Sequence, residues 1–105
     1  MMDLNEKLYE ELLAGDKPLL VEYWAPWCVY CRRIVTAMDQ VAKRHPDRVT
    51  VGRINIDDFP ALAARERIEV VPTLVLYHGG EALGSIVAPE SRSRIEEFLD
   101  DYLEG

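Results

Sequence analysis

Residues 19–31 read LLVEYWAPWCVYC, and they contain both cysteines of the 105-residue chain, Cys28 and Cys31. Residues 18–25 form a short apolar and aromatic run that is hydrophobic on both faces apart from Glu22, which is typical of a central, buried strand. Beyond the cysteines, apolar residues recur at the period of a helix. The segment therefore predicts a Cys-x-x-Cys pair at the junction between a buried strand and a helix.

The remaining sequence alternates helical and extended patterns. The strands at 18–25 and 49–56 are joined by a helix and should be parallel, whereas a turn at 78–80 should make the last two strands antiparallel. Asp3 and Glu6 resemble a capping box for the first helix. We expect one α/β domain over residues 1–105, with a mixed sheet of about four strands and helices on both faces. The patterns predict helices at 4–13, at 31–45, after Asp57 or Asp58 with Pro60 in the first turn, and at 95–103, and strands at 18–25, 49–56, 73–77 and 82–87.

The composition limits the classes of partner. The chain has 19 acidic and 12 basic residues and a net charge of -7, which argues against nucleic acid or an anionic membrane as the main partner, because both need clustered cations. No segment approaches the roughly 20 apolar residues of a membrane span. The N-terminus lacks the positive start and apolar run of a secretory signal. We expect a monomer in the cytoplasm, where a close cysteine pair is more often catalytic or metal-binding than structural.

Four roles are open to the cysteine pair. A zinc site usually needs four protein ligands, and the two histidines, His45 and His78, are distant and singly placed. A structural disulfide that closes two intervening residues would constrain the unfolded chain little, and two inert thiols would have no chemistry. Redox exchange fits better, because a helix N-terminus favours a thiolate at Cys28 and Cys31 lies one turn deeper, close enough to resolve a mixed disulfide.

Three segments resemble the thioredoxin superfamily, and together with the C-terminal helix they extend the resemblance over nearly the whole chain. LLVEYWAPWCVYC is similar to the family's active-site strand and turn, RINID at 53–57 to its next strand, and VVPTLVLYHGGE at 70–81 to its cis-proline segment. The resemblance implies a thioredoxin fold, and the short N-terminus implies that the usual first edge strand is absent or vestigial. It also implies a thiol–disulfide oxidoreductase that reduces protein disulfides, binds no cofactor or metal, and receives electrons from a partner disulfide reductase.

The resemblance assigns roles to individual positions. Cys28 would be the exposed nucleophile, Cys31 the buried resolving thiol, and Pro72 the cis-proline that faces them. Val71 would offer its backbone to an extended substrate segment. The substrate-binding rim would consist of Trp27, Val29, Tyr30, Val71, Val87 and Ala88.

Glu22 lies on the predicted strand and should point beneath the cysteine pair. It is either a strand-end carboxylate that reaches water, or a buried carboxyl with a raised pKa that accepts and supplies the proton of Cys31. Arg53 matches a position where the family often has lysine. It would partly offset the buried charge, but arginine stays protonated and cannot relay protons.

Three departures from the family pattern keep other functions open. The dipeptide between the cysteines is Val29-Tyr30 instead of Gly-Pro, so Tyr30 has a backbone N–H that could bond a thiolate. Glu22 replaces the usual aspartate, as in protein disulfide isomerase domains, and Ala88 replaces a glycine. Glu22 thus keeps a disulfide oxidase or isomerase of the same fold open, and a second alternative, from another class, is a thioredoxin-fold binding subunit whose thiols are incidental.

Overall fold

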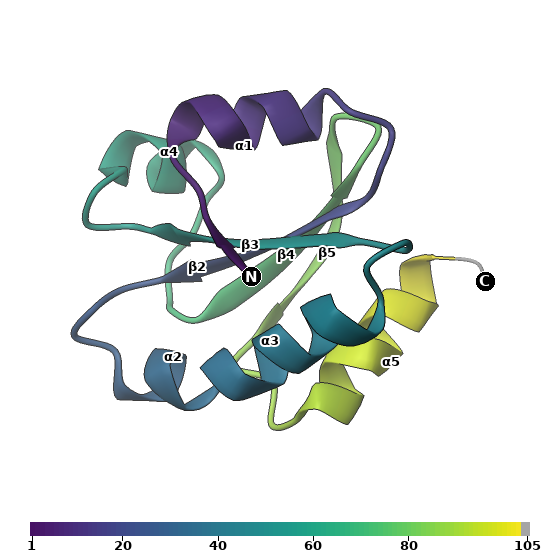
Figure 1. Cartoon of the computed structure of the whole chain (residues 1–105). Coiled ribbons are helices and arrows are strands. Elements are labelled where there is room, and N and C mark those ends of the chain that lie inside the picture. The colour runs from purple at the N-terminus through teal and green to yellow at the C-terminus, as the bar shows by residue number, and fades with distance from the viewer. Residues whose placement is uncertain (104–105) are drawn as a thin grey trace.

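The computed structural model describes residues 1–103 of the chain. Its elements are β1 (Met2–Asp3), α1 (Glu6–Leu13), β2 (Leu19–Trp24), α2 (Val29–Arg33), α3 (Val35–Arg44), β3 (Thr50–Asn55), α4 (Pro60–Arg65), β4 (Thr73–His78), β5 (Glu81–Val87) and α5 (Arg92–Tyr102). Within residues 1–103 a five-stranded sheet has the order β1-β3-β2-β4-β5. Helices α1 and α4 cover one face, and α2, α3 and α5 cover the other (Figure 1).

Strand β2 lies at the centre of the sheet, as its apolar composition predicts. It pairs in parallel with β3, from Leu19 opposite Thr50 to Trp24 opposite Asn55, and antiparallel with β4. Strand β5 completes an antiparallel hairpin with β4. The predicted parallel and antiparallel pairings are both confirmed, and the mixed sheet has the layered form of a thioredoxin fold.

Because side chains alternate along β2, this strand contributes residues to two hydrophobic cores, one on each face of the sheet. Leu20 packs with residues of α3 and α5, including Met38 and Phe98. Leu19, Val21 and Tyr23 point to the other face and pack with residues of α1 and α4. The same alternation places Glu22 on the face of Leu20, beneath α2 and α3.

The expected number of strands is wrong by one, because a reduced edge strand is present. Met2 and Asp3 pair in parallel with Gly52 and Arg53. The next residue, Leu4, is 4% exposed and packs directly over Gly52, where a Cβ atom would lie 2.7 Å from the Leu4 side chain. Gly52 therefore lets the N-terminus approach the sheet. The sequence did not predict β1, because its two residues are too few to give a periodic pattern.

Two of the predicted helix caps are also wrong. Asn5 is the N-cap of α1, since its side chain accepts the N–H of Leu8 at 2.8 Å, and Asp3 lies in the edge strand. Helix α4 has Phe59 at its N-cap without a side-chain hydrogen bond, and neither Asp57 nor Asp58 caps it. Pro60 does begin this helix, where its missing N–H has no cost.

The long helix expected at 31–45 is divided into two. Helix α2 begins at Val29, before the second cysteine, and α3 begins at Val35. Ile34 separates them with φ -88° and ψ 0°. The segment contains neither glycine nor proline, so the sequence carries no signal for this break.

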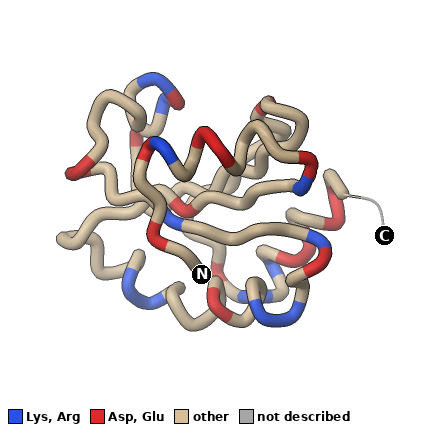
Figure 2. The backbone as a smooth tube through the Cα atoms, turned by 45° about the horizontal axis from the view of Figure 1, so that its top comes forward, with Lys and Arg blue, Asp and Glu red and all other residues tan. Residues whose placement is uncertain are grey.

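Charged side chains of both signs are interspersed along the chain (Figure 2). His45 and Glu96 lie 2.6 Å apart, and Arg48 and Asp100 lie 2.7 Å apart, so both pairs join the end of α3 and the following loop to α5. The hydrogen bond to His45 lowers the pKa of Glu96. His45 therefore has a structural partner. In residues 1–103 no helix is long and apolar enough to cross a bilayer.

Candidate active site

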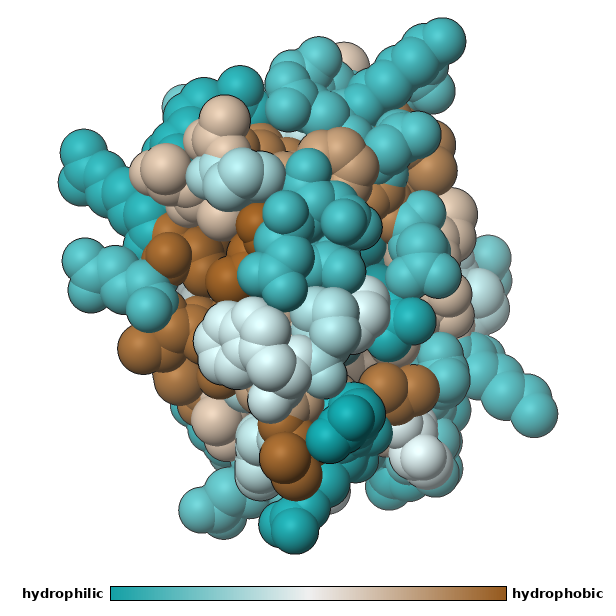
Figure 3. Space-filling model, turned by 90° about the vertical axis from the view of Figure 1, so that its left-hand side faces the viewer, coloured by the Kyte–Doolittle hydropathy of each residue, from teal (hydrophilic) through white to brown (hydrophobic). Residues whose placement is uncertain are grey.

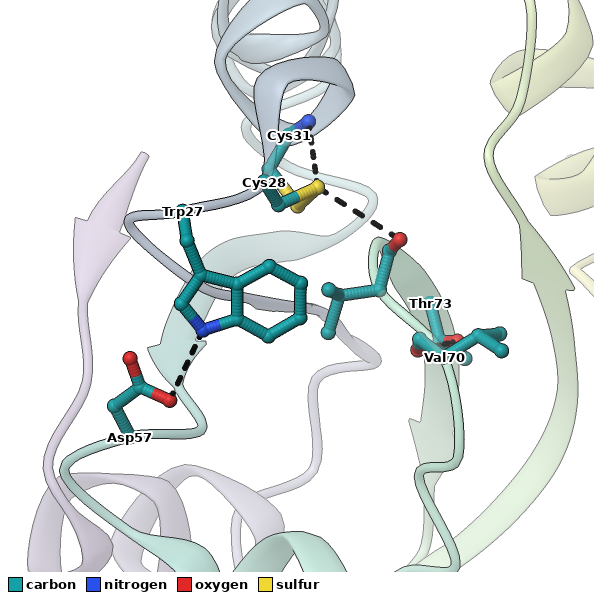
Figure 4. The surroundings of a disulfide bond; sticks show 7 residues. Trp27, Cys28, Cys31, Asp57, Val70 and Thr73 are labelled. Atoms are coloured by element: carbon teal, nitrogen blue, oxygen red, sulfur yellow. Dashed lines mark hydrogen bonds between the residues drawn. A yellow bond between two sulfur atoms is a disulfide. The ribbon is translucent and has the colours of Figure 1, made fainter.

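The two cysteines lie where β2 ends and α2 begins, and they form a disulfide with a Cα–Cα distance of 5.3 Å (Figure 4). The turn between the strand and the helix is closed by the N–H of Cys28, which donates to the carbonyl of Ala25 at 3.1 Å. Cys28 is 8% exposed and Cys31 is 1% exposed. Both cysteines are buried, so the prediction of an exposed Cys28 holds only relative to Cys31.

Cys28 is also the N-cap of α2. Its sulfur accepts the backbone N–H of Cys31 at 3.1 Å. The N–H groups of a first helical turn have no partner within the helix, and the helix dipole is positive at this end. Both effects favour a thiolate on Cys28 once the disulfide is reduced. The bond comes from Cys31, whereas the sequence suggested the N–H of Tyr30.

The loop before β4 faces the cysteines. The Val71–Pro72 peptide bond is cis, and the Cys28 sulfur lies 3.7 Å from the carbonyl oxygen of Val71. Thr73 fixes this loop by donating its hydroxyl hydrogen to the carbonyl of Val70 at 2.7 Å. Proline at 72 has no N–H, so the backbone at that position offers the sulfur no donor.

Three large apolar side chains are exposed near the pair, and the face of the molecule in Figure 3 mixes hydrophobic and hydrophilic residues. Trp27 is 66% exposed, Val29 55% and Val87 56%. The Trp27 indole N–H donates to Asp57 at 3.4 Å, which holds the ring beside the cysteines (Figure 4). Exposed apolar patches of this kind suit recognition of other proteins.

The rim differs in detail from the set expected from the sequence. Val71, Ala88 and Tyr30 are partly covered, and the Tyr30 hydroxyl is turned toward the carbonyl of Pro89. Val70 is 51% exposed and belongs with the apolar rim. Val70 was not predicted from the sequence, although the run Val70-Val71 before the proline was a usable signal. The contacts of Asp57 and Pro89 were not predicted either, and no sequence pattern indicates them.

Glu22 is buried, so the prediction of a strand-end carboxylate that reaches water is wrong. The side chain is 1% exposed, so it does not reach water at a strand end. Neither carboxylate oxygen has a hydrogen-bond partner. Burial raises the pKa of Glu22 to about 7, the charge of Asp39 adds to this rise, and that of Arg53 opposes it. The carboxyl group therefore gains and loses its proton near neutral pH.

Arg53 lies opposite Glu22 in the parallel pairing of β2 and β3. Its guanidinium group nevertheless donates to Asp3 at 2.6 Å and lies over the ring of Trp24, 4.4 Å from the ring centre. Arg53 therefore stabilises the Glu22 carboxylate by its charge at a distance, without a hydrogen bond. Asp3, in the edge strand β1, binds the Arg53 guanidinium group in place of Glu22.

Within residues 1–103, no group of three or more histidine, cysteine, aspartate or glutamate side chains is placed to hold a metal ion. The cysteine pair is bonded to itself.

Comparison with known proteins agrees with this geometry. The thioredoxin family profile matches residues 1–101. The thioredoxin of Alicyclobacillus acidocaldarius subsp. acidocaldarius is 33% identical over 98% of this chain and 98% of its own length. The thioredoxin of Porphyra purpurea is 34% identical, over 90% of this chain and 88% of that protein. A chloroplastic M-type thioredoxin of Zea mays is 35% identical over 94% of this chain and 60% of its own length.

The chain belongs to the thioredoxin family. With its cysteine pair at disulfide distance, it is a thiol–disulfide oxidoreductase with the disulfide reductase activity of that family. One departure from the family pattern has a structural consequence, because Ala88 adopts φ +45°. Glycine takes this left-handed conformation freely, whereas alanine does not.

The burial of Glu22 predicts a specific dependence of stability on pH. Its pKa is about 7 in the folded chain against an ordinary value of 4.5, so the unfolded chain ionises more readily and stability falls as pH rises from 4.5 to 7. The free energy of unfolding of Glu22→Gln, relative to that of the parent, should therefore increase by about 3 kcal/mol between pH 4.5 and pH 8. Urea unfolding at a series of pH values measures this, with the exposed Glu10→Gln as the control for removing one carboxylate. Parallel curves for Glu22→Gln and the parent would contradict the raised pKa.

Proposed function

We propose that this protein reduces disulfides in other proteins, with Cys28 as the nucleophile and Cys31 as the resolving thiol. The observation that carries the proposal is the contact between the Cys31 N–H and the Cys28 sulfur, at 3.1 Å, at the start of α2. This contact stabilises a thiolate on the more exposed of the two sulfurs. The assignment of roles is supported by that difference in exposure.

The reaction proceeds in two exchanges. The thiolate of Cys28 attacks one sulfur of the substrate disulfide, forms a mixed disulfide and releases the other substrate sulfur as a thiolate, which takes a proton from water. Cys31 then loses its proton and attacks the sulfur of Cys28. This step forms the Cys28–Cys31 disulfide and releases the second substrate thiol. Two electrons pass from the pair to the substrate, and the pair returns to the dithiol form by exchange with a reductase.

Glu22 is proposed as the group that accepts the Cys31 proton. It lies on the sheet face covered by α2 and α3, and its pKa of about 7 suits proton transfer at neutral pH. A carboxyl group without hydrogen-bond partners can take up a proton without breaking an existing contact. Arg53 supports the ionised form by its charge.

Substrate binding is proposed to use the rim and the backbone beside Pro72. An extended segment of the substrate would pair with the backbone of Val71, whose carbonyl lies close to the Cys28 sulfur. Trp27, Val29 and Val87 would contact its side chains. These contacts depend on backbone and apolar surface, so they suit many different protein substrates.

The partners and the cellular location follow from this chemistry. We propose a monomer that binds no cofactor and receives electrons, ultimately from a nicotinamide cofactor, through a partner disulfide reductase. The reducing cytoplasm would keep the pair as a dithiol between reactions. The high negative charge supports protein disulfides over nucleic acids and anionic membranes as partners.

Serine variants test the roles of the two cysteines. Cys28→Ser should lower dithiothreitol-driven insulin reduction to the uncatalysed rate, because no nucleophile remains. Cys31→Ser should still form a mixed disulfide with insulin but should not release it, and mass spectrometry would detect the adduct. An adduct on Cys31 in the Cys28→Ser variant, at the parental rate, would reverse the assignment. Cellular function that survives both substitutions together would favour a binding subunit.

Substitution of Glu22 tests the proton transfer. Glu22→Gln preserves the volume of the side chain but cannot accept a proton, so the resolving step should slow by about tenfold to a hundredfold near pH 7. Stopped-flow release of substrate thiol from the mixed disulfide, between pH 6 and pH 9, measures this step. The parent should show an inflection near pH 7 that the variant lacks. Identical profiles would exclude Glu22 from the reaction.

The reduction potential of the pair tests the direction of electron flow. Equilibration with glutathione buffers should give a value near about -270 mV, in the range of thioredoxins. A value near about -180 mV or higher would favour the oxidase or isomerase, in which Val29-Tyr30 stabilises the reduced form. The reduction potential of the active-site variant Tyr30→Pro measures the effect of the dipeptide, because the rest of the sequence is unchanged.

A further inference from the structure

Tyr30 makes a contact that the reaction as described above does not use. It lies between the cysteines and packs partly buried against both the cysteine cluster and the core beneath α3 and α5. Its hydroxyl donates a hydrogen bond to the carbonyl of Pro89 at 2.9 Å. Tyr30 therefore ties the cysteine turn to residues 87–89, which run from the last residue of β5 into the following segment and which we call the rim loop.

The rim loop has an unfavourable backbone conformation. Ala88 has φ +45°, in the left-handed region that non-glycine residues adopt only when their surroundings fix it. One restraint is the N–H of Ala88, which donates to the carbonyl of Pro72 at 3.0 Å. The other is the hydrogen bond from Tyr30 to Pro89. The loop is therefore held between the cis-proline segment on one side and the cysteine turn on the other.

Packing restrains the loop at Pro89, which is buried, but less at Val87 and Ala88. A hollow of about 330 Å³ lies against it, and the Val87 side chain is 56% exposed. Without the Tyr30 hydroxyl, the loop could move toward this hollow as Ala88 relaxes to a negative φ. The hollow is lined by Val87, Ala88, Pro89, Glu90 and Arg94.

We propose that Tyr30 is a positioning residue that sets the affinity for protein substrates by holding the rim loop in place beside Cys28. This inference rests on the proposed function. A protein segment that pairs with Val71 must also lie along the rim loop, because Ala88 and Pro72 are hydrogen-bonded neighbours. A small disulfide needs to reach only the Cys28 sulfur. Loss of the tether should therefore affect the two kinds of substrate unequally.

The test compares Tyr30→Phe with the parent on two substrates. Phenylalanine keeps the ring but lacks the hydroxyl, and the hydrogen bond is to a partly buried carbonyl. We expect kcat/KM for insulin to fall about threefold to tenfold further than kcat/KM for dithionitrobenzoate, mainly through KM. Hydrogen exchange of the Ala88 amide should become faster, while the reduction potential stays within the error of the parent's. An equal fall for both substrates, or a changed potential with unchanged KM, would overturn the proposal.

A second substitution tests whether Tyr30 acts through the loop. In Ala88→Gly the left-handed conformation is no longer disfavoured, so adding Tyr30→Phe should reduce insulin affinity less than it does in the parent. An equal loss in both backgrounds would overturn the role assigned to the loop. Failure of the parent protein to reduce insulin would instead reject the proposed function, and exchange of the Ala88 amide would still report whether the hydroxyl holds the loop.

Discussion

The sulfur of Cys28 accepts the N–H of Cys31 in the first turn of α2, and the active-site end of the molecule is arranged around that contact. It requires β2 to end close to the site where the helix begins, and the bond from Cys28 to Ala25 makes this turn. A sulfur in this position replaces the oxygen of a usual N-cap side chain, but it also reacts. In the proposed reaction the same atom both stabilises the helix start and acts as the nucleophile, so a change at Cys28 affects the fold and the chemistry together.

The central strand also carries Glu22, the proton acceptor that we propose. Because side chains alternate along β2, a residue on the face of Leu20 lies beneath α2 and α3, and Glu22 occupies that face. Burial gives the carboxyl a pKa of about 7, which a surface glutamate would not have. Arg53 is close enough to moderate this effect, yet it pairs with Asp3. If Arg53 bonded Glu22 directly, the pKa would be lower and the carboxylate a weaker base.

The sequence predicted those parts of the structure that depend on long or distinctive patterns. The apolar run of β2, the Gly-Gly turn and the stripe of α5 each extend over several residues, and all three elements lie where they were expected. The short edge strand had no such pattern, since it depends on pairing with β3, and the break at Ile34 lies in a segment without glycine or proline. In the site, the position of Cys28 at a helix start followed from the motif. The direction of the Arg53 side chain and the tether from Tyr30 to Pro89 depend on residues far apart in the chain, and a single sequence does not pair them.

The core on the α1 and α4 face of the sheet satisfies the polar atoms of its tyrosines. Tyr77 donates to Glu66 at 2.7 Å, and Tyr23, whose hydroxyl lies 2.6 Å from that of Tyr77, donates to it in turn. By contrast, within residues 1–103 the buried side-chain atoms without a partner are both oxygens of Glu22, the Trp24 indole nitrogen and one Arg48 nitrogen.

The free-energy cost of this arrangement is substantial. Ionised Glu22 costs about 3 kcal/mol above pH 7, and the left-handed Ala88 about 1–3 kcal/mol, against a total stability of about 5–15 kcal/mol for a typical domain. Such costs persist only where the rest of the fold offsets them. Selection for stability alone would have removed the buried carboxylate, so its retention points to a constraint other than stability.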